Sequence, residues 1–221
     1  NPTPGFLEAI RSITKKHGIV LIMDEITVGW RLHFGGMHLK YGIEPDMAVF
    51  AKALGNGYPI GAVIGTKAAM EGAQRSFISS TYWTESLGSV AALATISAME
   101  KLDIQKAIEH SGQQIQGILQ TTAASENLPL QVKGFPALTS FSFDHPESEM
   151  LRTIFTQQML SKGFLAGTSF YPTLSHNELI IGLYHQALAE TFGFLSQVIK
   201  ENNFKKWPNE EKAHSGFSRL L

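Results

Sequence analysis

The chain has 221 residues, 43% of them hydrophobic, which is enough for one large or two small domains with a sizeable core. With a net charge of −1 and 17% charged residues, nothing in the charge balance points to nucleic acid or an anionic membrane surface as a partner. The absence of cysteine excludes disulfides, thiolate metal sites and a cysteine nucleophile, and no apolar run reaches the roughly 20 residues of a membrane span. We find no signal peptide and expect a cytoplasmic globular protein without nucleic-acid or membrane partners.

The first hundred residues alternate helical patterns with short apolar runs. Helical spacing of apolar residues predicts a helix over 6–16. The continuous apolar run 18–23 predicts a strand covered on both faces, so Asp24 is expected at a buried strand tip. The later predictions are strands over 47–51 and 60–66, a short helix over 67–73 and a buried helix over 87–99. This alternation indicates an α/β fold with a mostly parallel sheet.

The pattern changes after about residue 100. Amphipathic stretches over 103–120 and 148–163 predict helices, the alternating "ALTSFSFD" predicts a strand, and "ELIIGLY" (178–184) predicts another strand before a helix over 186–200. We therefore divide the chain into residues 1–100, part of a large domain, and 101–221, a small α+β domain. We expect its tail (202–221) to pack on the surface or on a partner, and we expect the chain to be N-terminally truncated.

Three polar features stand where open α/β sheets bind ligands, at or after the ends of strands. They are Asp24, Lys52, and the hydroxyl cluster "SSTYWT" over 79–84, which we expect to open a helix. Singly, each has an ordinary explanation: a cap or ion pair, a lysine with a buried stem, and an N-cap at Ser80 or Thr81. Together they suit an aldehyde cofactor, which needs a lysine amine, a carboxylate at a ring nitrogen and hydroxyls at a phosphate.

Three motifs, "LIMDEITVGWR", "PDMAVFAKALGNGYPIG" and "SSTYW", occur in the order found in class III aminotransferases. The chain resembles that family of fold type I enzymes, which depend on pyridoxal 5′-phosphate (PLP), and within it the glutamate-1-semialdehyde aminomutase-like members. The resemblance implies that Asp24 pairs with the pyridine nitrogen, Ile26 packs on the ring and Lys52 forms the Schiff base. It also implies a homodimer in which Thr81, with Ser80 beside it, reaches the phosphate of the neighbouring subunit's cofactor.

The chain departs from the family pattern in three places. Glu85 and Ser86 stand where "G-N-P" is common, and Thr27 replaces a frequent glutamine. The stretch 170–184 lacks the arginine with which many members bind a substrate carboxylate. These departures indicate a subgroup with altered loop contacts and without the usual carboxylate clamp in the C-terminal domain.

The resemblance implies transfer of an amino group between an amino compound and an oxo or aldehyde compound, either between molecules or within one, as in an aminomutase. Lys52 would also move the proton at the substrate carbon. A decarboxylase or racemase on the same scaffold, and a non-catalytic degenerate relative, remain alternatives. Other sites are disfavoured: "GNGYPIG" leads into a strand and not a helix, and His33 and His38 lack the spacing of a zinc pair.

Overall fold

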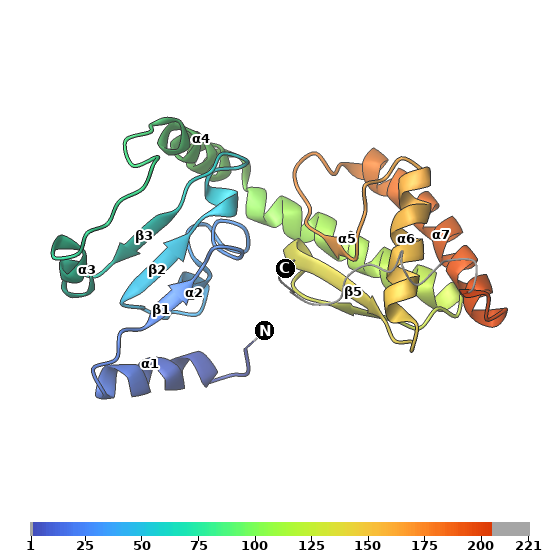
Figure 1. The fold of residues 1–221 in the computed structure, drawn as a ribbon, viewed down its shortest axis with the longest axis horizontal. Coiled ribbons are helices and arrows are strands. Elements are labelled where there is room, and N and C mark those ends of the chain that lie inside the picture. The colour runs from blue at the N-terminus through green and yellow to red at the C-terminus, as the bar shows by residue number, and fades with distance from the viewer. Residues whose placement is uncertain (1, 205–221) are drawn as a thin grey trace. The chain divides into compact units, whose positions relative to one another are not determined.

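A computed structural model of the protein describes residues 2–204, which form two compact units divided between Lys106 and Ala107 (Figure 1). Both units combine helices and strands, which confirms the predicted α/β class. None of the described helices is long and apolar enough to cross a membrane. The predicted packing of the tail concerns residues that lie almost entirely outside the described range.

The first unit follows the predicted order of helices and strands. The helix predicted over 6–16 and the strands predicted near 47–51 and 60–66 are confirmed. Its elements are α1 (Phe6–Lys16), β1 (Ile22–Asp24), α2 (Met37–Lys40), β2 (Met47–Phe50), the 3-10 helix η1 (Lys52–Leu54), β3 (Ala62–Gly65), α3 (Lys67–Gln74) and α4 (Leu87–Leu102).

The sheet of this unit has the order β1-β2-β3, with the three strands side by side (Figure 1). β1 pairs with β2 in parallel, and β2 pairs with β3 antiparallel, so these strands form a mixed sheet and not the mostly parallel one expected. The physical reason lies in the β2–β3 connection, which contains only the single turn of η1. A parallel pair needs a longer crossover, usually through an α-helix.

The apolar run before Asp24 is less covered than predicted. Ile19, Val20 and Ile22 are each more than half exposed, and only 22–24 form the strand. The core of this unit is small, with buried Ala48, Phe50, Leu54 and Ala92 as its centre. A continuous apolar run indicates a strand covered on both faces, but the described residues supply no such cover on β1.

The helix α4 was predicted to be buried, but the structure buries only part of its surface. Ala92 and Met99 are buried, whereas Leu87, Val90 and Leu93 are between 61% and 70% exposed. Its small residues do allow a close approach: a Cβ at Gly88 would lie 3.1 Å from the carbonyl oxygen of Pro59. The helix thus packs through one face only.

The second unit packs helices on an antiparallel sheet of order β4-β5-β6. The helices predicted over 103–120 and 148–163 and the strand in "ALTSFSFD" are confirmed. Its elements are α5 (Ile104–Ser125, which begins just before the unit boundary), β4 (Leu130–Lys133), the 3-10 helix η2 (Pro136–Leu138), β5 (Thr139–Phe143), α6 (Ser148–Ser161), β6 (Ser169–Phe170) and α7 (Glu178–Lys200). The rings of Phe141, Phe143, Phe155 and Phe192 form the centre of its core.

The strand predicted over 178–184 is wrong, because these residues form the first two turns of α7. Asn177 caps the helix, and its side-chain oxygen accepts a hydrogen bond of 3.0 Å from the Ile180 N–H. The buried positions include Ile181, Tyr184 and Leu188, which recur every three or four residues. The buried residues therefore recur with helical spacing throughout 178–184, although the apolar run of this segment resembles that of a strand.

Candidate active site

The parallel pairing of β1 and β2 brings two of the predicted site residues to one edge of the sheet. Asp24 is the last residue of β1 and lies opposite Val49 in β2, and the next N–H, of Glu25, donates to the Val49 carbonyl at 2.9 Å. Lys52 follows the end of β2 by two residues. Because parallel strands end at the same edge, the carboxylate and the amine leave the sheet there together.

Lys52 leaves β2 in an unusual backbone conformation. Its φ is 44°, in the left-handed region that a residue with a side chain adopts at some cost. Its Nζ donates a hydrogen bond of 2.6 Å to Oγ1 of Thr27, which lies in the loop after β1. The side chain is exposed, so the amine is accessible to solutes.

The turn after Lys52 depends on residues that tolerate close approach and positive φ. A Cβ at Gly55 would lie 2.2 Å from the Tyr58 carbonyl oxygen, so no larger residue fits without a shift of the backbone. Asn56 and Gly57 adopt φ of 46° and 107°. The "GNG" motif of the sequence is therefore a structural requirement of the turn that presents Lys52.

Asp24 lies at the strand tip as predicted but is exposed, whereas the sequence indicated burial. Its Oδ1 accepts a hydrogen bond of 2.9 Å from the Ile26 N–H, which orients the carboxylate. Among the described residues, Oδ2 takes no hydrogen bond, so one oxygen remains available to a ligand. Ile26 is half-buried beside it.

Glu25 has a structural role in this region that no sequence pattern predicts. Its side chain is 1% exposed and accepts hydrogen bonds of 2.8 Å from the backbone N–H groups of Met37 and His38. His38 Nδ1 lies 2.8 Å from the same carboxylate, so His38 is engaged here and is not half of a zinc pair with His33. Glu25 thus ties the loop after β1 to α2. The only signal in the sequence is an acidic residue within an apolar run.

Ser80 and Thr81 are not brought to Lys52 by any contact among the described residues. The hydroxyl cluster precedes α4 and does not open it, because the helix begins at Leu87 with Ser86 as its N-cap residue. Both side chains are exposed, and Ser80 Oγ accepts a hydrogen bond of 3.2 Å from the Tyr82 N–H. Glu85 takes the capping role, because its carboxylate accepts from the Leu87 N–H at 2.7 Å.

A bidentate ion pair fixes the entry to β2. Arg11 of α1 donates to both oxygens of Asp46, at 2.7 and 3.1 Å, and the Leu21 N–H donates to Asp46 at 2.8 Å. The hydrogen bond from Arg11 and then that from Leu21 hold the pKa of the Asp46 carboxyl below its usual range. This pair joins α1 to the start of both parallel strands.

Comparison with known proteins gives the same assignment for most of the chain. The sequence profile described as "Aminotransferase class-III" matches residues 1–187. The 3-aminobutyryl-CoA aminotransferase of Cloacimonas acidaminovorans is 32% identical over 157 residues, covering 71% of this chain and 38% of that protein. The glutamate-1-semialdehyde 2,1-aminomutase of Desulfosudis oleivorans is 31% identical over 183 residues, covering 76% of this chain and 43% of that protein.

Solved structures share the fold. The PLP form of the Sphingopyxis FumI protein superposes with a TM-score of 0.81 at 20% identity over 90% of this chain, and an omega-transaminase of Sphaerobacter thermophilus does so with a TM-score of 0.76 at 22% identity over 88%. The chain covers 48% of each of these two structures. It thus spans less than half the length of these relatives and structures.

Proposed function

We propose, because the chain belongs to the class III aminotransferase family, that it takes part in PLP-dependent transfer of an amino group between an amino compound and an oxo or aldehyde compound. The observation that carries the proposal is the parallel pairing of β1 and β2, which brings Asp24 and Lys52 to one sheet edge. An aspartate alone or a lysine alone at such a sheet edge does not indicate this cofactor. A carboxylate can pair with the ring nitrogen of a pyridine aldehyde, and an accessible primary amine can react with its aldehyde carbon.

The residues at this edge fit the cofactor. Asp24 keeps one carboxylate oxygen without a hydrogen bond from the described residues, and that oxygen can accept a hydrogen bond from the protonated ring nitrogen of PLP. The exposed amine of Lys52 can hold the aldehyde carbon covalently. Ile26, two residues after Asp24, offers a half-buried apolar side chain to the ring face.

Each residue then has a defined task. PLP, when bound, supplies the electron sink for the bond broken at the amino-bearing carbon. Asp24 would keep the ring nitrogen protonated through its negative charge. The amine of Lys52, when it is not bound to the cofactor, would hold and return the proton at the substrate carbon. Thr27 Oγ1 orients the Lys52 amine through their 2.6 Å hydrogen bond.

We further propose that the working unit is a homodimer in which Thr81 and Ser80 hold the phosphate of the partner's cofactor. Two observations support this arrangement. The two hydroxyls have no contact with Lys52 among the described residues, and the segment around them exposes large apolar side chains: Phe77 is 97% exposed, Tyr82 73% and Trp83 66%. Apolar surface of this kind is typical of a protein–protein interface.

The test is chemical labelling of the lysine. The purified chain is mixed with PLP and reduced with borohydride, and the modified peptide is mapped by mass spectrometry. We expect the label at Lys52, its loss in Lys52→Arg and its retention in Lys67→Arg, a control at an exposed lysine of α3. Label scattered over surface lysines would contradict the assignment of Lys52.

The relationship to the Desulfosudis aminomutase favours a second candidate reaction, transfer of the amino group within one molecule. Product analysis separates the possibilities. A new amino compound formed from an added oxo acid indicates transfer between molecules, and isomerisation of a single amino aldehyde indicates transfer within one. Release of carbon dioxide or loss of chirality without amino transfer would identify a decarboxylase or racemase instead.

A further inference from the structure

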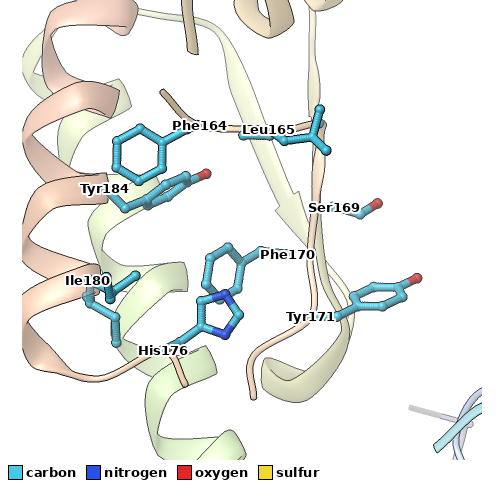
Figure 2. Close-up of a pocket in the computed structure, with 11 residues that line it drawn as sticks. Phe164, Leu165, Ser169, Phe170, Tyr171, His176, Ile180 and Tyr184 are labelled. Atoms are coloured by element: carbon cyan, nitrogen blue, oxygen red, sulfur yellow. The ribbon is translucent and has the colours of Figure 1, made fainter. Parts of the chain in front are cut away.

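The second unit contains a cavity of about 250 Å3 between β6, the segment before it and α7 (Figure 2). Most of its wall is carbon, from the side chains of Phe164, Leu165, Ala166, Phe170, Ile180 and Ile181. An engineered protein cavity of about 150 Å3 is large enough to take up benzene, so this one has room for a ring with a substituent. The cavity lies apart in sequence from Asp24 and Lys52, and its lining includes part of the stretch 170–184 that lacks the arginine of many family members.

The hydroxyl of a buried tyrosine points into this cavity. Tyr184 of α7 is 4% exposed, and its ring packs between Phe164 and Phe170 at centroid distances of 5.8 and 5.4 Å. Figure 2 shows the hydroxyl directed from α7 toward the segment on the other side of the cavity. Among the described residues, this hydroxyl makes no hydrogen bond. Burial raises the pKa of Tyr184, so the hydroxyl keeps its proton and can donate it.

A second donor stands at the other end of the cavity. His176 Nδ1 accepts a hydrogen bond of 2.9 Å from the Thr173 N–H, so the neutral ring carries its proton on Nε2. Its ring lies 4.8 Å from that of Phe170, and Figure 2 shows it reaching toward the cavity. Among the described residues, no Lys, Arg, Asp or Glu lines the cavity.

We propose that this cavity binds a small neutral carbonyl compound with an aromatic or compact apolar body. The Tyr184 hydroxyl opens onto the cavity without a hydrogen-bond partner among the described residues, and an acceptor oxygen on a ligand would give it one. An ionised acid is disfavoured because no cationic side chain lines the cavity to neutralise it. The apolar walls take up the body of the ligand through the hydrophobic effect.

The test uses two probes of matched shape, acetophenone and ethylbenzene, which differ in the carbonyl oxygen. The full chain is labelled at isoleucine methyl groups, and NMR follows the signals of Ile180 and Ile181, which line the cavity. We expect acetophenone to shift both signals and to bind more tightly than ethylbenzene. Tyr184→Phe removes only the hydroxyl, so it should weaken acetophenone about tenfold and leave ethylbenzene unchanged.

A blocking variant completes the design. Ile180 is 38% exposed at the cavity, so Ile180→Trp should fill the space and abolish the binding of both probes at Ile181. Leu179→Trp, at the neighbouring and 70% exposed position outside the cavity wall, should leave binding intact. Absence of shifts in wild type, equal binding of the two probes, or unchanged acetophenone affinity in Tyr184→Phe would each overturn the proposal. The labelling of Lys52 by PLP is independent of all these results.

Discussion

The ammonium group of Lys52 donates a hydrogen bond of 2.6 Å to the hydroxyl of Thr27, and this bond joins the turns that follow two parallel strands. The two residues are 25 positions apart in the sequence. Lys52 therefore turns its amine toward the end of the neighbouring strand, where Asp24 lies. Thr27 appeared in the sequence only as a departure from a family pattern, and the structure gives that departure a physical role.

Removal of this hydroxyl should slow the reaction of Lys52 with PLP. Thr27→Val keeps the shape of the side chain but frees the amine to rotate, so we expect a three- to tenfold loss in the rate of label formation, as for the loss of about one hydrogen bond. Thr27→Ser keeps the acceptor and should react at a rate close to that of wild type. Both rates are measured by trapping with borohydride over time. Equal rates of label formation in wild type and Thr27→Val would contradict the orienting role of Thr27.

Glu25 should be important for stability and not for chemistry. In Glu25→Gln the amide nitrogen replaces one acceptor oxygen and faces backbone donors, so a buried N–H of Met37 or His38 loses its partner. We expect the free energy of unfolding to fall by about 1–3 kcal/mol, measured in urea. Glu71→Gln, at an exposed position in α3, should change it by less than about 0.5 kcal/mol. A similar effect in the two variants would contradict this role.

Two glycines of α5 should respond oppositely to the same change. A Cβ at Gly112 would lie 2.0 Å from the Pro136 carbonyl oxygen, whereas a Cβ at Gly117 meets nothing within 4 Å. Gly112→Ala should therefore destabilise the protein by about 1–3 kcal/mol through overpacking. Gly117→Ala should stabilise it by roughly 0.5–1 kcal/mol, because alanine favours the helix. Thermal unfolding of the pair tests the packing of η2 on α5, and a tolerated Gly112→Ala would refute it.

The ion pair of Arg11 and Asp46 should make stability depend on pH in the acid range. The pKa of Asp46 is lowered in the folded state, so its contribution is fully present above the unfolded pKa of about 3.9 and is lost as the pH falls through the folded pKa. Asp46→Asn should lower the free energy of unfolding at neutral pH, and the difference from wild type should shrink below pH 4.

Urea unfolding at a series of pH values measures this difference. Asp103→Asn, at the exposed left-handed C-cap of α4, is the control, since asparagine adopts that conformation readily. If the difference in the free energy of unfolding between wild type and Asp46→Asn stayed constant across the acid range, the charge of Asp46 would not contribute to stability.

Local sequence patterns predicted helices and strands well where interactions between residues close in sequence determine them. The helix over Phe6–Lys16 has a clear apolar stripe and a glycine after its end, and its predicted limits match the structure. "ELIIGLY" failed because seven apolar-rich residues fit both a strand and a helix, and the cap at Asn177 decides between them. A single asparagine is a weak signal in sequence but supplies a definite hydrogen bond in the structure.

Burial was predicted less well than secondary structure. The run before Asp24 has the composition of a strand covered on both sides, yet composition cannot specify which element provides the cover, and Ile22 is 54% exposed in the structure. Conversely, Glu25 lies within the same apolar stretch and is buried because its partners come from α2, twelve and thirteen positions later. Pairings across such separations leave no periodic trace in the sequence.

The left-handed backbone at Lys52 has a consequence for related chains. The direction of its amine depends on a φ of 44°, and the turn over Gly55–Gly57 is built around that conformation. A relative in which bulkier residues replace these glycines would turn the lysine side chain elsewhere while retaining both the lysine and the aspartate. Such a chain would retain both reactive residues but would no longer direct the lysine amine toward the aspartate. Activity in a relative should therefore be inferred from the residues of the turn as well as from the lysine and the aspartate.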